Sequence, residues 1–185
     1  MRSLEKEYKA LIRSQSHILQ QWSEGEISYG KMAEMLAEAI VHFGATKYNP
    51  ELVQPIKNEN WAKPKGGLWT SPVNSEWGWK HWCEAESFRD CNEENSFKLL
   101  LNFDAKIFII DSLNDLKNAP LVEYKIGSSY KKMYLDFETL AKTYDAIWLT
   151  AKGQSQTHLS HPINLYGWDC ESVLIMNPYC CSEVS

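Results

Sequence analysis

The spacing of apolar and polar residues divides the chain into a helical leader and a longer segment of mixed character. Over residues 4–22 apolar side chains recur close to the period of a helix, and residues 23–26 interrupt that pattern. A second helix is predicted from Ser28 to about Glu38. We therefore expect a helical hairpin extension over residues 1–38 and a separate domain over residues 39–185.

After residue 38, short apolar runs alternate with turn residues. The pattern predicts strands over 39–45, 67–72, 97–101, 106–110, 146–150 and 172–176, and helices over 75–87 and 135–144. Residues 151–162 are interpreted as a polar loop, and Asn177-Pro178 is expected to close the final strand. Short strands mixed with short helices behind a helical leader predict an α+β fold.

Composition narrows the possible classes of function. The 185 residues carry 19 basic and 24 acidic side chains, for a net charge of −5. This balance argues against a protein that binds nucleic acid or a membrane surface through a basic patch. Only Arg2, Arg13 and Arg89 are arginines, whereas the chain has eight tryptophans. A stretch over residues 25–37 is reminiscent of the first helix of a helix-turn-helix, but no recognition helix follows it.

The cysteines and the N-terminus indicate a reducing compartment. The five cysteines are an odd number, two are adjacent, and no C-x-x-C pair occurs, so neither a disulfide framework nor a zinc site is predicted. The first residues are charged and amphipathic, unlike a signal peptide, and no apolar run approaches ~18 residues. We expect a cytoplasmic protein, or one delivered to a host cytosol.

Four segments are candidates for chemistry. His42 lies inside an apolar strand, where a buried histidine bonded to a main-chain carbonyl is the simpler interpretation. Residues 63–72 combine two glycines with hydroxyl and aromatic side chains, which suits either a ligand loop or a tight turn into a strand. The tryptophans of residues 77–82 fit core packing at helical spacing. Glu171 opens an apolar strand, where burial of its charge requires a partner.

The order of these segments resembles the ADP-ribosyltransferases of the histidine type, the branch of diphtheria toxin and the poly-ADP-ribose polymerases. VHFGA, KPKGGLWTSP and GWKHWCEAE are similar to the "YHGS…GFYLT…WA" layout of small bacterial and phage members. AKIFIIDSLNDL and LDFETLAKTYDAIWL resemble their middle region, and WDCESVLIMNP resembles their closing strand. The resemblance covers roughly residues 39–178. It implies a core of two small packed antiparallel or mixed sheets.

The resemblance also implies roles for individual residues. His42 and Glu171 correspond to the catalytic pair, with His42 on the NAD hydroxyls and Glu171 on the nicotinamide-ribose 2′-hydroxyl. The remaining cofactor-binding positions it implies are Gly44, Gly67, Leu68, Trp69, Thr70 and Ser71. Asp169 takes the acceptor-side position, although an aspartate is short for that role. The arginine-type branch needs an arginine on its first strand, and none lies between Arg13 and Arg89.

The resemblance predicts an enzyme that transfers ADP-ribose from NAD to a macromolecular acceptor. We expect a phage or bacterial effector, and we expect its acceptor to be a protein rather than a nucleic acid. No metal and no membrane are expected. The T-S-P hydroxyl motif departs from the usual S-T-S, and no tyrosine stands at the expected pocket position. An inactive module that binds a nucleotide or a protein partner therefore stays an alternative. A third alternative is a hydrolase that uses Cys170 or a metal held by His158 and His161.

Overall fold

A curled seven-stranded mixed sheet dominates the structure, a computed structural model that describes residues 38–102, 104–126 and 130–184. Its strands are β1 (Ile40–Phe43), β2 (Leu68–Pro72), β3 (Ser96–Leu101), β4 (Ile107–Ile110), β7 (Ala146–Leu149), β8 (Ser172–Ile175) and β9 (Cys181–Val184). They follow the order β4-β7-β8-β2-β1-β3-β9, in which β4 and β7 are parallel and all other neighbours are antiparallel.

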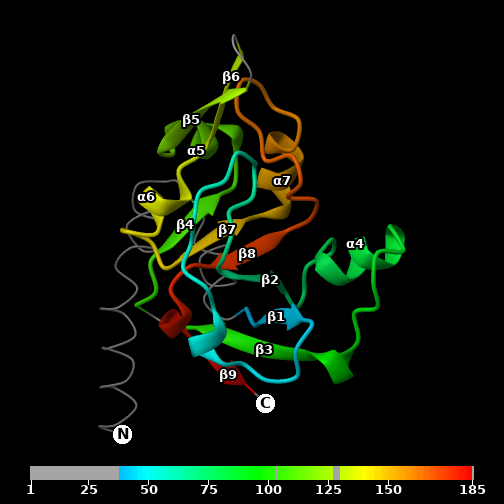
Figure 1. Ribbon diagram of the computed structural model, residues 1–185. Coiled ribbons are helices and arrows are strands. Elements are labelled where there is room, and N and C mark those ends of the chain that lie inside the picture. The colour runs from blue at the N-terminus through cyan, green and yellow to red at the C-terminus, as the bar shows by residue number, and fades with distance from the viewer. Residues whose placement is uncertain (1–37, 103, 127–129, 185) are drawn as a thin grey trace, which may run out of the picture.

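The other elements surround this sheet (Figure 1). The strands β5 (Leu121–Ile126) and β6 (Tyr130–Leu135) form a two-stranded hairpin at the end of the molecule opposite β3 and β9. The helices of the described residues are α4 (Trp79–Ala85), α5 (Leu113–Asn118), α6 (Phe137–Leu140) and α7 (Ala151–Thr157), and the 3-10 turns are η1 (Pro50–Leu52), η2 (Glu93–Asn95) and η3 (Pro178–Cys180). The fold is therefore α+β, as the sequence predicts.

The strand β2 changes partner along its length. Its first three residues, 68–70, pair with β8, whereas Ser71 and Pro72 pair with β1. The three strands on one side of β2 and the three on the other are thereby joined into one curled sheet. The resemblance implies two small sheets packed on each other. The structure differs, because β2 belongs to both halves and the hydrogen bonding is continuous.

Two apolar clusters lie on the two faces of the sheet. The first is enclosed by the curl and joins both halves, with Ile40, Leu99, Ile107, Trp148 and Val173 among its buried side chains. The second lies on the other face, where α5, α6 and the 163–168 segment cover the central strands. A smaller cluster under α4 holds Cys83 and Cys91 against β1.

Most predicted strands are confirmed to within a residue or two, and the exceptions have physical causes. The predicted polar loop over residues 151–162 is wrong, because residues 151–157 form α7, which Thr150 caps by accepting from the N–H of Gly153. The strand at 172–176 is not the last, since β9 follows and pairs with β3. The helix predicted over 75–87 begins only at Trp79. The predicted helical hairpin lies outside the described residues, except for Glu38, so the domain boundary stays a prediction.

Candidate functional site

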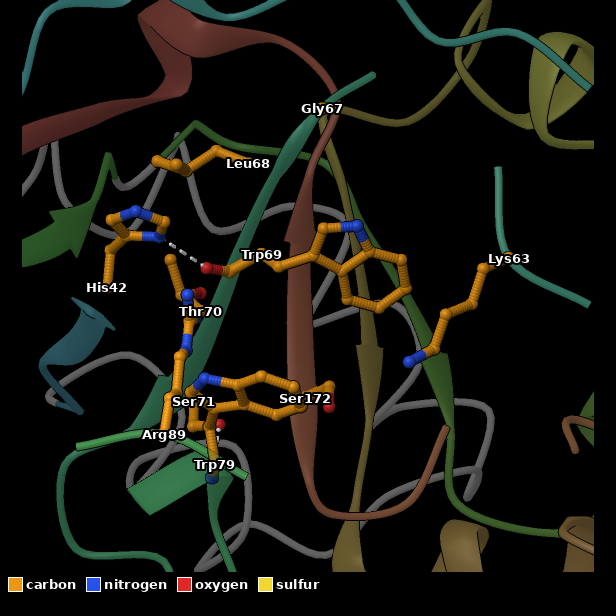
Figure 2. Close-up of a pocket in the computed structure, with 10 residues that line it drawn as sticks. All are labelled: His42, Lys63, Gly67, Leu68, Trp69, Thr70, Ser71, Trp79, Arg89 and Ser172. Carbon is orange, nitrogen blue, oxygen red and sulfur yellow. Dashed lines mark hydrogen bonds between the residues drawn. The ribbon is translucent and has the colours of Figure 1, made fainter. Parts of the chain in front are cut away.

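A cavity of about 290 Å³ opens beside β2, where that strand passes from β8 to β1 (Figure 2). It is lined by His42, Lys63, Gly67, Leu68, Trp69, Thr70, Ser71, Trp79, Arg89 and Ser172. Six of the candidate residues from the sequence therefore lie around one space, although 25 positions separate His42 from Gly67. The cavity is near the lower end of the size range of small-molecule sites.

The imidazole of His42 is fixed in one orientation by the main chain of β2. Its Nδ1 lies 2.8 Å from the carbonyl oxygen of Trp69. A carbonyl only accepts, so Nδ1 carries the proton and Nε2 of the neutral ring offers a lone pair. Burial lowers the pKa of His42, the bond to Trp69 opposes that shift, and the charge of Arg89 adds to it. The ring is thus both the carbonyl-bonded histidine of the simpler interpretation and a hydrogen-bond acceptor beside the cavity.

Gly44 stays close to this histidine but is not part of the cavity wall. A Cβ atom at Gly44 would lie 3.6 Å from Nε2 of His42 and 3.6 Å from Nη1 of Arg89. Its φ of +123° is a conformation that favours glycine. The ligand-contacting role predicted for Gly44 stays a prediction.

The start of β2 requires glycine for two reasons. Gly67 has a φ of +70°, and a Cβ there would lie 2.7 Å from Cδ1 of Leu174 and 2.9 Å from the carbonyl of Ile175. This close approach lets β2 pair with β8 directly from Leu68 onward. Further along, Thr70 donates from its hydroxyl to the carbonyl of Val173 at 2.8 Å. The Thr70 hydroxyl therefore ties β2 to β8.

Ser71 connects three elements at the floor of the cavity. Its hydroxyl donates to the carbonyl of Glu171 at 3.0 Å and accepts from the main-chain N–H of Trp79 at 2.9 Å. The first turn of α4 is thereby fixed to β2 and to the start of β8. Both predicted hydroxyl residues thus hold the walls of the site in place.

Two tryptophans form aromatic walls of the cavity. Trp69 stands edge-on to the buried Trp168, with ring centroids 4.6 Å apart. Trp79 stacks on Trp82 at 4.9 Å with an interplanar angle of 18°. The sequence pattern predicts that the tryptophans of α4 pack in the core. Trp79 does pack on Trp82, but it also lines the cavity (Figure 2).

Two cations face these rings: Lys63, which begins the candidate segment 63–72 but has no predicted role, and Arg89, which lies outside the candidate segments. The ammonium of Lys63 lies 5.4 Å from the ring centroid of Trp69, and the guanidinium of Arg89 lies 5.3 Å from that of Trp79. Arg89 also donates from Nη2 to the carbonyl of Phe43 at 3.2 Å. The scarcity of arginine is the one sequence signal that draws attention to Arg89.

Glu171 is buried and directly precedes Ser172, a residue of the cavity lining. The residue as a whole is 7% exposed. Its Oε2 accepts from the hydroxyl of Ser75 at 2.8 Å and its Oε1 from the indole N–H of Trp148 at 3.1 Å. Ser172, the next residue, lines the cavity, whereas Glu171 does not. The sequence predicts that a buried Glu171 needs a partner, and the structure supplies two neutral donors, Ser75 and Trp148.

Asp169 lies at the edge of the site. Its Oδ2 is 3.8 Å from the ammonium of Lys63, and its carbonyl accepts from the indole N–H of the exposed Trp77 at 3.1 Å. The side chain of Asp169 is 27% exposed. It is the carboxylate that approaches Lys63, and its acceptor-side role stays a prediction.

The hydrolase alternative depends on a metal site or on a reactive Cys170. In the described part of the chain, no three side chains among His, Cys, Asp and Glu gather as metal ligands. Burial raises the pKa of Cys170, which disfavours the thiolate that a nucleophile needs.

Across the residues that the structure describes, no helix has both the length and the apolar character that a membrane crossing requires.

Comparisons of the chain with protein-family models, with curated proteins and with solved structures found no match.

Proposed function

We propose that the chain is an NAD-dependent ADP-ribosyltransferase of the histidine type, with the nicotinamide end of NAD in the cavity beside β2. One observation carries the proposal: His42, two tryptophan faces and two cations surround one cavity, next to β8, which begins directly after Glu171.

The charges of the cavity complement those of NAD. NAD carries a cationic pyridinium ring and two phosphate charges. Arg89 and Lys63 offer the cations that suit phosphates, and the carboxylate of Asp169 next to Lys63 suits the pyridinium. The Trp69 and Trp79 rings give the planar group apolar faces. Nε2 of neutral His42 accepts a hydrogen bond from a ribose hydroxyl.

Glu171 is assigned the electrostatic role. Cleavage of the nicotinamide–ribose bond develops positive charge on the ribose, and a carboxylate held in a dry site stabilises it. The carboxylate is bonded to Ser75 and Trp148, so catalysis requires it to exchange the Ser75 bond for one to the substrate. ADP-ribose then passes to an acceptor. We propose that this acceptor is a protein that binds on the Asp169 side, in the bacterial or host cytosol.

A second candidate function rests on a specific observation. Both carboxylate oxygens of Glu171 are occupied by neutral donors, and the side chain does not line the cavity. This arrangement favours a module that binds a nucleotide without cleaving it. The two candidates share the cavity and differ in whether Glu171 acts on the ligand.

The test measures binding and turnover separately. Purified protein is incubated with NAD, alone and with bacterial lysate, and released nicotinamide and labelled acceptor are quantified; NAD binding is measured by calorimetry. Glu171→Gln is expected to lower nicotinamide release by about 100-fold, the size of a single electrostatic group, whereas Glu84→Gln on the exposed side of α4 leaves it unchanged.

Each outcome selects between the candidates. Binding of NAD with no nicotinamide release in the wild type favours the binding module. Absence of both binding and release with every lysate overturns both candidates.

A further inference from the structure

The ammonium of Lys63 lies in a setting that is typical of a bound cation. It is 5.4 Å from the centroid of Trp69 and 6.0 Å from that of Trp79, so it faces two indole rings at once (Figure 2). The carboxylate of Asp169 completes the setting at 3.8 Å. Aromatic faces combined with a carboxylate are how proteins recognise organic cations such as quaternary ammonium groups.

We propose that Trp69, Trp79 and Asp169 form a cation slot, that Lys63 is its built-in occupant, and that the pyridinium ring of NAD displaces the Lys63 ammonium from it. The identity of the displacing ligand rests on the proposed function. The slot itself rests on the placement of these four side chains beside Arg89, whose guanidinium also faces Trp79, 5.3 Å from its ring centroid.

The walls of the slot are fixed and its occupant is not. Trp69 is supported by the buried Trp168, and Trp79 is supported by stacking on Trp82. Lys63, by contrast, keeps a 32% exposed side chain, and the 3.8 Å separation from Asp169 is at the long end for an ion pair. Such a contact contributes little free energy, so the ammonium moves into water at small cost while the rings stay in place.

Displacement also explains how the slot would treat reactant and product differently. When the nicotinamide–ribose bond breaks, its electron pair goes to the ring nitrogen, and the pyridinium becomes neutral nicotinamide. The cation–π attraction and the attraction to Asp169 are then lost. The Lys63 ammonium regains the slot, and the product leaves. While it is displaced, Lys63 remains near the mouth of the cavity as a cation for the phosphates.

The experiment separates the slot from the rest of the NAD site. The probes are 1-methylnicotinamide, a pyridinium cation without ribose or phosphate, and neutral nicotinamide. Their affinities are measured by NMR titration of the indole N–H signals for the wild type, for Lys63→Ala and for the matched control Lys65→Ala, which removes an exposed lysine outside the cavity.

Lys63→Ala is expected to bind 1-methylnicotinamide about fivefold more tightly than the wild type, the order expected when one cation–π competitor is removed. Its affinity for nicotinamide changes less than about twofold, because the neutral ring gains no cation–π attraction. Lys65→Ala matches the wild type. Adding Asp169→Asn to Lys63→Ala abolishes the gain, since the slot then lacks its carboxylate.

The proposal is overturned when Lys63→Ala binds the cation no more tightly than the wild type, which includes the absence of measurable binding in both. It is also overturned by an equal gain for both probes, because the gain then reflects added space and not charge. A cation-selective gain in a protein that neither binds nor cleaves NAD keeps the slot and rejects the transferase.

Discussion

His42 donates a hydrogen bond from Nδ1 to the main-chain carbonyl of Trp69, over 2.8 Å, at the point where β2 leaves β8 for β1. This bond joins the two halves of the curled sheet and at the same time sets which ring nitrogen is available beside the cavity. The fold and the candidate chemistry are therefore coupled through one side chain.

That coupling predicts a pH dependence of stability. The pKa of His42 lies below its ordinary value of 6.5 because burial disfavours the charged form. Above the unfolded value the ring is neutral in both states and its contribution is complete. As the pH falls below 6.5 the unfolded chain takes up the proton first, so stability is lost until the folded pKa is passed.

Urea denaturation at pH 7.5 and 5.5 measures this effect. The wild type is expected to lose more free energy of unfolding over that interval than His42→Gln, which has no proton to gain. His161→Gln, a change at an exposed histidine, should behave as the wild type. Equal pH slopes for the wild type and His42→Gln would contradict the assignment of a neutral, partly buried ring.

The carboxylate of Glu171 and the hydroxyl of Ser75 are predicted to be energetically coupled. Ser75→Ala removes one of two donors to a buried carboxylate and should cost about 1–3 kcal/mol. Glu171→Gln should also destabilise, because its amide N–H₂ faces a donor. The double variant should cost less than the sum of both, by about 0.5–3 kcal/mol.

Chemical denaturation of the four proteins of this cycle gives the coupling directly. Ser182→Ala on the exposed side of β9 is the control for loss of a hydroxyl. A coupling free energy of zero would mean that Ser75 and Glu171 act independently, against the 2.8 Å contact.

Elements marked by turn residues are those that the sequence predicts well. Gly44 follows β1, Gly67 precedes β2 and Pro72 ends it, and the predicted ranges of both strands overlap the observed ones closely. The helix α7 escapes prediction because its buried residues are Gly153 and Thr157. It therefore has no apolar face that a hydrophobic period detects.

The candidate site is predictable only where its residues are close in sequence. Residues 67–71 stand together in one motif, and His42 stands out as a histidine in an apolar strand. The partners of Glu171, by contrast, are Ser75 and Trp148, which lie 96 and 23 positions away. Such pairs leave no periodic trace, because Trp148 reaches Glu171 only through the pairing of β7 with β8 and Ser75 only through the tertiary fold.

Gly153 is predicted to tolerate no side chain, for reasons of space and not of backbone conformation. A Cβ at this position would lie 1.9 Å from the carbonyl oxygen of Ile110 and 2.8 Å from its carbon. Because both are main-chain atoms of β4, α7 has to move away from the sheet. Gly153→Ala should cost about 3 kcal/mol, as severe overpacking does.

Thermal and urea unfolding test this prediction against Ser155→Ala, which places the same residue at an exposed position of the same helix. The control should be neutral or slightly stabilising, since alanine is the best helix former. A Gly153→Ala variant as stable as the control would show that α7 does not approach β4 as closely as the structure places it.

Arg89 is predicted to bind the phosphates of the ligand. Its guanidinium lies beside Trp79 and above Gly44, at the cavity and not at the far edge of α4. Arg89→Ala should weaken NAD binding about tenfold, which corresponds to about 1.4 kcal/mol. ADP-ribose should lose the same factor and free nicotinamide nothing, because only the first two carry phosphates. Calorimetry with the three ligands, repeated at higher salt where the loss should shrink, measures the pattern.

Lys106→Ala, which removes an equal charge next to β4, is the control. An Arg89→Ala variant that weakens nicotinamide binding as much as NAD binding would place Arg89 at the ring and not at the phosphates.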